Sequence, residues 1–259
     1  MVKGLYTAYT GMLNEQNRMD IMTNNLANAS TVGFKKEGAT SQSFNDVLTV
    51  KIKDASVGLS NVQSIGVKNP GVKIGENYTD YSQGSFRITN NTYDLALSGE
   101  GFFAIEFTNK AGETSTKYTR AGQFTLNKDG YLVTQEGDYV LDTQNRRIQL
   151  DTLTDSSIDT DGTISQNGEN IARIQVVDFE NYDYLEKYGE TYFEAIEGAE
   201  LTQSDATINS GYLEMANVQI VSEMVNMISI TRAYETNQKI VQAYDDTLDI
   251  AVNQLGRLR

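Results

Sequence analysis

The stretch NVQIVSEMVNMISITRAYETNQKIVQAYDDTLDIAVNQL, residues 217–255, decides the fold of this chain. No glycine or proline lies between Tyr212 and Leu255, which permits one long uninterrupted helix. The pattern predicts a helix over 217–258, with Asn217 as its N-cap. About 41 residues at ~1.5 Å each would form a rod of roughly 60 Å. Apolar residues repeat every seven positions at Ile220, Met227, Tyr234, Val241, Leu248 and Leu255. A second seam, three residues further on, contains Ile230, Tyr244, Ala251 and Leu258.

A second helix is predicted near the amino terminus, over residues 4–28. Leu5, Met12, Met19 and Leu26 also recur every seven positions, and Met22 extends the same side. Gly11 lowers the helix propensity by ~1 kcal/mol relative to alanine, so this helix should be weak in isolation. Residues 24–33 contain Asn, Ser, Thr and Gly in the proportions of a helix exit and turn.

The middle of the chain, residues 34–210, is predicted to be mostly β. Short runs of Val, Ile, Thr, Tyr and Phe, such as 102–107, 131–134, 139–141 and 171–177, alternate with turn signals. The pairs Asp129-Gly130, Asp161-Gly162 and Asn167-Gly168 are typical of hairpin turns. The spacing favours a small antiparallel barrel or sandwich, whereas 37–80 looks extended and partly irregular.

These patterns predict an α+β chain: long N- and C-terminal α-helices forming a coiled-coil-like domain, with a central all-β region that is barrel-like or sandwich-like. Three parts are expected. Residues 1–33 and 211–259 form a discontinuous helical assembly domain. Residues 34–98 form an extended or irregular β connecting region, and residues 99–210 form an acidic outer β domain.

Composition excludes several classes of function. The net charge is −14, and residues 99–210 hold 21 acidic against 8 basic side chains, which argues against a general nucleic-acid binder. The chain has no Cys and no His, so zinc sites of the usual ligand sets, Ser-His-Asp triads and disulfides are ruled out. We therefore expect no catalytic residues, no metal and no cofactor. The amino terminus lacks the apolar run of a cleaved signal peptide, and no stretch is apolar enough to span a bilayer.

Each predicted helix carries an apolar stripe that needs a partner, and chain ends often lie close together. Apolar positions between 218 and 228 cover about 180° of the C-terminal helix, more than the ~100° of a helix with one buried face. Further copies of the chain would cover the remainder, and head-to-tail contacts that do not close form a helical filament. Periodicity alone favours an ordinary core helix or a simple coiled-coil dimer over a filament.

Several segments, in this order, resemble the bacterial flagellar axial proteins of the basal-body rod and hook family. They cover most of the chain and read NNLANASTVGFK (24–35), DLALSGEGFF (94–103), YTRAGQF (118–124), DGYLV (129–133), GYLE (211–214), EMVNMI (223–228) and RAYE (232–235). Each alone is weak, but together they are specific. The length and the run from 226 to 235 are most like distal rod members, with a proximal rod or hook subunit as the alternative.

The resemblance implies a structural subunit, not an enzyme, located in the basal-body rod. Its terminal helices would polymerise into a tubular axial filament that transmits torque and forms part of the export channel. The implied partners are further copies of the chain, other rod and hook subunits and the type III export apparatus, with no nucleic acid and no membrane insertion. Export would take place without a cleaved signal peptide.

Two sets of residues follow as candidate sites. The expected assembly contacts are Leu5, Met12, Met19, Met22, Leu26, Ile220, Met227, Ile230, Tyr234, Val241, Tyr244, Leu248 and Leu255. The family motif positions are Asn24, Asn25, Leu26, Ala27, Asn28, Gly33, Phe34, Gly99, Gly101, Phe102, Arg232, Ala233 and Tyr234.

A function of another class is a secreted polysaccharide hydrolase or carbohydrate-binding module. The acidic run 178–200 contains carboxylates among Tyr and Phe, and a glycosidase needs two carboxylates at a fixed separation. Loss of sugar cleavage on replacing Glu186 or Glu190 would favour that alternative. A third hypothesis is an intracellular coiled-coil dimer with a β sensor domain.

Overall fold

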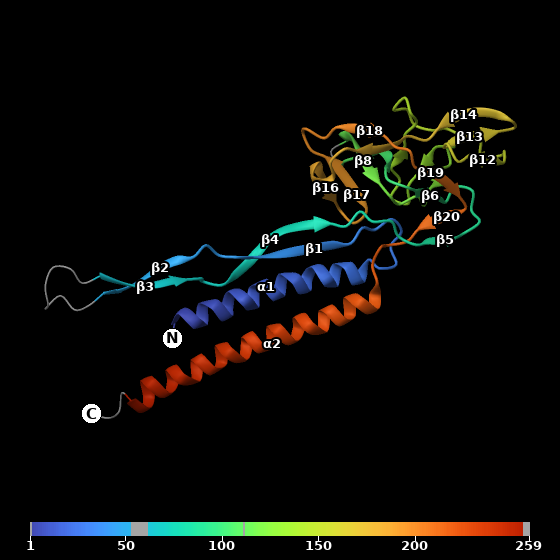
Figure 1. The fold of residues 1–259 in the computed structure, drawn as a ribbon. Helices are drawn as coiled ribbons and strands as arrows, with labels where there is room; N and C mark the ends of the chain where they lie inside the picture. Colours follow the sequence, from blue (N-terminus) through green and yellow to red (C-terminus); the bar gives the residue numbers. More distant parts are fainter. Residues whose placement is uncertain (1, 53–61, 111, 256–259) are drawn as a thin grey trace. The chain divides into compact units, whose positions relative to one another are not determined.

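The computed structural model of the chain describes residues 2–52, 62–110 and 112–255 (Figure 1). It divides into a helical unit, residues 1–26, 37–80 and 220–259, and a β unit, residues 27–36 and 81–219. The fold is α+β, with a helix at each end of the chain and a β-rich middle, as predicted. The expected connecting region 34–98 is divided between the two units, because 37–80 groups with the helices and 81–98 with the β strands.

In the helical unit, α1 (Val2–Ala27) and α2 (Ile220–Ile250) run side by side in opposite directions, and a π-helical turn (Ala251–Leu255) extends α2 (Figure 1). Two glycines mark where the helices approach closely. A Cβ added at Gly4 would lie 2.1 Å from Tyr244 Oη, and one at Gly11 would lie 3.0 Å from Asn237 Nδ2. Gly11 therefore weakens α1 but makes room for a side chain of α2.

The described residues between 37 and 79, expected to be extended and partly irregular, instead pair as a long antiparallel hairpin. Strand β1 (Glu37–Ser43) pairs with β4 (Val72–Thr79), and β2 (Val47–Ile52) pairs with β3 (Val62–Lys68). The segment 53–61 lies outside the described residues. A two-stranded ribbon is marginal on its own and needs a covering element. The hairpin runs along α1, which supplies that cover for β1 and β4 (Figure 1).

Polar side chains on one face of α1 hold the hairpin. Thr7 Oγ1 donates to a hairpin carbonyl at 3.1 Å, and Asn14 Nδ2 donates to Ser41 Oγ at 3.1 Å. Asn25 bonds Glu37 twice, donating to its carbonyl at 2.7 Å and accepting from its N–H at 2.9 Å. At 100° per residue, Thr7, Asn14 and Asn25 lie within an arc of about 20°. The apolar stripe predicted from the spacing of seven lies on a different side of the helix.

The β unit contains one large sheet and several small ones. The large sheet has the order β16-β17-β8-β7-β11-β10-β9, with β15 pairing β7 and β18. The smaller sheets are β12-β13-β14, β19-β6 and β20-β5. The bounds are β5 (Phe86–Ile88), β6 (Leu95–Ser98), β7 (Phe102–Thr108), β8 (Thr114–Thr119), β9 (Thr125–Leu126), β10 (Leu132–Val133), β11 (Tyr139–Val140), β12 (Ser156–Ile158), β13 (Thr163–Gln166), β14 (Glu169–Arg173), β15 (Val176–Phe179), β16 (Leu185–Tyr188), β17 (Tyr192–Ala195), β18 (Leu201–Gln203), β19 (Thr207–Ser210) and β20 (Tyr212–Glu214), with a 3₁₀ turn at Tyr182–Tyr184.

Two apolar clusters lie on opposite faces of β7, because successive side chains of a strand point to opposite sides. Phe103 joins a cluster with Leu95, Phe124 and Ile148. Phe102 joins the other cluster, which includes Tyr118, Phe179 and Phe193. Every side chain from Phe102 to Ile105 is buried. Strand β7 is therefore the central element of the β unit.

Two local predictions have different outcomes. The Asn167-Gly168 turn between β13 and β14 is confirmed, with φ values of 53° and 82° that suit a type I′ hairpin. The N-cap assignment of Asn217 is wrong, since α2 begins three residues later at Ile220. The Asn217 side chain instead accepts the N–H of Lys36 at 2.8 Å.

Candidate functional site

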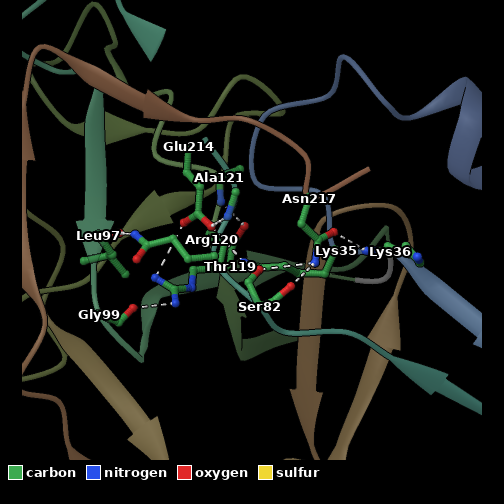
Figure 2. Close-up of polar contacts among 12 residues, drawn as sticks. Lys35, Lys36, Ser82, Leu97, Gly99, Thr119, Arg120, Ala121, Glu214 and Asn217 are labelled. Atoms are coloured by element: carbon green, nitrogen blue, oxygen red, sulfur yellow. Dashed lines mark hydrogen bonds and ion pairs between the residues drawn. The ribbon is translucent and has the colours of Figure 1, made fainter. Parts of the chain in front are cut away.

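A buried charged cluster joins three segments that are remote in sequence (Figure 2). Glu214, the last residue of β20, is 1% exposed and accepts a hydrogen bond from Lys35 Nζ at 2.8 Å. The same oxygen, Oε1, accepts the N–H of Gly84 at 2.9 Å. Lys35, also 1% exposed, donates to the carbonyl of Ser82 at 2.8 Å. All these residues belong to the β unit. We call Lys35, Arg120 and Glu214 the junction cluster.

Arg120, directly after β8, is the second cation of the junction cluster. Its Nη2 donates to the carbonyl of Gly99 at 2.6 Å, and its Nη1 lies 3.6 Å from Glu214 Oε2. That separation is too long for a hydrogen bond. Within the described part of the chain, Arg120 Nε, Arg120 Nη1 and Glu214 Oε2 are buried without a hydrogen-bond partner. One carboxylate thus faces two cations and is hydrogen-bonded to only one of them.

Backbone contacts fix the same three segments. The N–H of Gly33 donates to the carbonyl of Glu214 at 2.8 Å, and the N–H of Met215 donates to that of Ser85 at 2.9 Å. Asn217 accepts from Lys36 and donates to Ser82, to its carbonyl at 3.2 Å and its hydroxyl at 3.1 Å. The segment that follows α1, the segment that follows β4 and the segment that precedes α2 are therefore held together inside the β unit.

Several motif positions lie in or beside the junction cluster. Gly33 and Gly99 contribute the backbone groups described above, and Phe34 is fully buried with Lys187 Nζ 4.2 Å from its ring centre. Phe102 lies 5.6 Å from the Arg120 guanidinium. Sequence reasoning missed the junction cluster itself. Lys35, Arg120 and Glu214 each stood inside a quoted motif, but nothing in their spacing indicates that they meet.

The predicted assembly residues of α1 and α2 lie mainly on the inward sides of these helices. Ile230 is 3% exposed, and Ile220 and Leu248 are exposed at 49% and 39%. The side chain of Leu255 lies outside the described residues. The remaining predicted contacts are partly buried: Leu5, Met12, Met19, Met22, Leu26, Met227, Tyr234, Val241 and Tyr244. Whether these residues also contact other copies stays a prediction.

A different set of apolar residues on α2 is open to solvent. Val221, Met224, Val225 and Ile228 are 77%, 50%, 61% and 53% exposed. Their spacing is that of one helix face, and a helical wheel places them about 170° from the inward seam centred near Ile230. We call these four residues the outer face of α2. Monomeric proteins rarely leave such a group uncovered, so it indicates an interaction surface.

The N-terminal helix has a smaller exposed apolar group. Tyr6, Tyr9 and Leu13 are 50%, 56% and 45% exposed, and their spacing of three and four places them on one side of α1. Arg232, whose role the sequence left open, is also exposed. On α2 the outer face is followed by polar residues, so its apolar character is concentrated in the first turns of the helix.

The carboxylates singled out for the hydrolase alternative lie in the hairpin formed by β16 and β17. Glu186 lies in β16 opposite Glu194 of β17. Glu190 accepts a hydrogen bond from Asn28 Nδ2 at 2.6 Å in the turn between these strands. The Glu190 carboxylate is therefore engaged in a contact within the β unit.

The carboxyl group of Asp138, which lies beside Tyr192 in the β unit, gives the stability of the chain a testable pH dependence. Tyr192 Oη lies 3.0 Å from Asp138 Oδ2, 3.0 Å from Glu136 Oε2 and 3.2 Å from Thr134 Oγ1. Burial raises the pKa of Asp138, although the hydrogen bond from Tyr192 opposes this shift. A raised folded-state pKa means that the folded chain binds the proton more tightly. The contribution of Asp138 to stability is therefore present at low pH and is lost as the pH rises through its folded pKa.

We expect Asp138→Asn to remove this contribution. The difference in the free energy of unfolding, variant minus original chain, should increase from pH 4 to pH 7. The original chain loses the contribution of Asp138 over this range, whereas the variant has no carboxyl there to lose a proton. Urea unfolding at both pH values measures the difference, with the exposed carboxylate variant Asp205→Asn as control. A difference that stays constant or shrinks as the pH rises would contradict the assignment.

Three protein families match the chain at segments that include its helices and the junction cluster. Residues 5–35 match "Flagella basal body rod protein", residues 96–166 match "Flagellar hook protein FlgE/F/G D1 domain", and residues 209–255 match "Flagellar basal body rod FlgEFG protein C-terminal". Each match contributes one member of the junction cluster: Lys35, Arg120 and Glu214.

Full-length relatives agree with these matches. The chain is 34% identical to flagellar basal-body rod protein FlgG of Bacillus subtilis (strain 168), over 98% of this chain and 99% of that protein. It is 33% identical to FlgF of Caulobacter vibrioides over 100% of both chains, and 33% identical to FlgG of the same organism over 98% and 99%.

Whole-length similarity of this kind defines an axial protein of the flagellar rod and hook class. The chain belongs to the flagellar basal-body rod protein family. It is a structural subunit of the bacterial flagellar basal-body rod, and its likeness to FlgG agrees with the distal-rod character expected from its sequence. Among the described residues, no helix is long and apolar enough to cross a membrane.

Proposed function

We propose that the chain polymerises through its two terminal helices into a tubular axial filament. The observation that carries this proposal is the outer face of α2, which remains exposed although the opposite side of the helix is turned toward α1. Burying a Val, Met or Ile side chain contributes about 1.5–3 kcal/mol, so covering four of them supplies a substantial driving force.

In the assembled rod, helices of neighbouring copies form a coiled-coil-like inner layer that lines the export channel. The contacts are heterologous, joining the outer face of one copy to a different surface of the next, and such contacts build a helix of subunits. The acidic β unit, with the barrel-like or sandwich-like region expected from the sequence, forms the outer layer. Torque passes along this tube through the helix contacts and the junction cluster.

The proposed partners are further copies of the chain, other rod and hook subunits and the flagellar export apparatus. Export would leave the amino terminus uncleaved, because α1 supplies the polar face that holds the hairpin and the glycines that receive α2. Removing this segment as a signal peptide would remove those contacts. The homologues are structural rod proteins, and the proposal assigns no catalytic step to the chain.

The experiment that tests the function uses an epitope inserted at the exposed turn Asn167-Gly168 of the full chain. In cells of the producing bacterium, immunogold label should appear on the axial structure of isolated basal bodies. Label on the distal part of the rod supports the distal assignment. Label confined to the proximal part supports the proximal-rod alternative instead. Label that is absent from basal bodies would overturn the proposal.

A further inference from the structure

We propose that Glu214 couples the two ends of the chain, so that the segment after α1 and the segment before α2 become fixed in one step. The inference rests on the proposed function, in which both terminal helices enter the rod. It concerns residues 31–36 and 212–217, which meet at the junction cluster inside the β unit (Figure 2). Glu214 acts as a positioning residue for both.

The first argument is charge. Lys35 and Arg120 are 1% and 3% exposed, and the Glu214 carboxylate is the anion between them. If the segment carrying Glu214 were not in place, Lys35 would lose the carboxylate oxygen to which its Nζ donates, and Arg120 would lose the carboxylate beside it. Removing one member of a buried ion pair is strongly destabilising. Docking of Glu214 therefore stabilises the buried position of Lys35.

The second argument is a pair of hydrogen bonds that join the two segments directly. The N–H of Gly33 donates to the carbonyl of Glu214, and the N–H of Lys36 donates to the side chain of Asn217. Both donors lie in the segment after α1, and both acceptors lie in the segment before α2. Loss of either segment would therefore break contacts of the other, and exchange at the two donor amides reports it.

The third argument is that the junction cluster is not optimised for stability. Arg120 Nη1 and Glu214 Oε2 stand 3.6 Å apart without a hydrogen bond. A buried ion cluster with unsatisfied atoms is a poor way to stabilise a fold, whereas buried charges can specify which segments pair. The geometry of the junction cluster is therefore better suited to specifying how the two segments pair than to raising the stability of the fold.

Hydrogen exchange on the purified full chain tests the coupling. In Glu214→Gln, the amides of Gly33 and Lys36 should exchange faster by on the order of a hundredfold, because the buried anion shared by Lys35 and Arg120 is removed. Amides of β7 should keep their protection, which shows that the β unit remains folded. Glu106→Gln, which breaks the more exposed pair with Arg147, serves as control and should leave Gly33 and Lys36 unchanged.

Coupling must also act in the opposite direction, because energetic coupling between two sites is reciprocal. Lys35→Met should accelerate exchange at the amide of Met215, which lies in the segment before α2 and donates to the carbonyl of Ser85. At the amides of Gly33, Lys36 and Met215, the double variant Lys35→Met/Glu214→Gln should lose less protection free energy than the sum of the losses in the two single variants. In basal bodies, Glu214→Gln should fail to incorporate, whereas Glu106→Gln should incorporate normally.

Three outcomes overturn the inference. They are unchanged protection of Gly33 and Lys36 in Glu214→Gln, unchanged protection of Met215 in Lys35→Met, and strict additivity in the double variant. All three readouts are measured on the purified chain and test only the coupling. Failure of the original chain to reach the rod is a different result, and it would overturn the proposed function. If Glu214→Gln also loses protection in β7, the Lys35→Met measurement decides the question.

Discussion

Gly33→Ala is expected to lower the free energy of unfolding of the β unit by about 3 kcal/mol. Gly33 has a φ of 69°, in the left-handed region that residues with a Cβ occupy only at a cost. A Cβ there would lie 2.3 Å from the backbone nitrogen of Ala121 and 2.5 Å from the carbonyl carbon of Arg120. Both contacts are with backbone, so the segment carrying Gly33 must move and the hydrogen bond to Glu214 is lost.

Gly137→Ala is the matched control for this prediction. Gly137 has a φ of 98°, but nothing lies within 4 Å of an added Cβ. The control therefore loses only the conformational term, about 1–2 kcal/mol. Equilibrium unfolding in urea, followed in both variants, compares the two positions directly. If Gly33→Ala is no less stable than Gly137→Ala, the close packing of Gly33 against residues 120–121 does not add to the free-energy cost of a Cβ at position 33.

The double variant Val221→Asp/Val225→Asp is expected to abolish incorporation into the rod while leaving the chain folded. Both side chains are exposed in the single chain, at 77% and 61%, so charge is tolerated there before assembly. At a contact between copies, each aspartate would be buried without a counter-ion. The association constant should fall by on the order of a hundredfold or more.

Gln238→Asp/Gln242→Asp provides the control, since it adds the same charge to exposed polar positions of α2. The measurement is the amount of each chain in isolated basal bodies, with swimming as a second readout and circular dichroism of the purified chain as the test of folding. Normal incorporation of the outer-face variant would show that rod contacts do not use this surface.

The two helices were predictable because their apolar spacing and their lack of helix breakers are local signals. The predicted bounds 4–28 and 217–258 compare with Val2–Ala27 and Ile220–Ile250. The N-cap error has a physical cause: the side chain of Asn217 bonds Lys36, a tertiary contact that overrides a local preference. The turn at Asn167-Gly168 was predictable because both residues tolerate positive φ.

The hairpin over 37–79 was not predictable from alternation. Much of its stability comes from α1, through side chains such as Asn14 and Asn25, and these polar residues look like surface residues in the sequence. Pairing of Leu48 with Val67 across the ribbon leaves both side chains exposed, so this apolar pair does not mark a buried face. The alternation of apolar and polar residues within a strand gives little indication of the strand when a helix from elsewhere in the chain, here α1, stabilises it.

The junction cluster was hidden for a different reason. Lys35, Arg120 and Glu214 are charged residue types that are normally exposed, and 179 positions separate Lys35 from Glu214. The heptad analysis identified the seam that includes Ile230. The wide apolar arc over 218–228 included Val221 and Val225, but these exposed residues were not named as assembly contacts. A wide apolar arc indicates extra contacts but does not separate those made within the chain from those made between copies.

The most direct test of assembly through α2 is thiol labelling of single-cysteine chains, because the natural sequence contains no cysteine. Val225→Cys should react rapidly with a maleimide in the dispersed full chain and should be protected in isolated basal bodies. Asn170→Cys, at an exposed position of β14, should react in both. If the thiol at position 225 remains as reactive in the assembled rod as in the dispersed chain, the outer face of α2 is not an interface between copies.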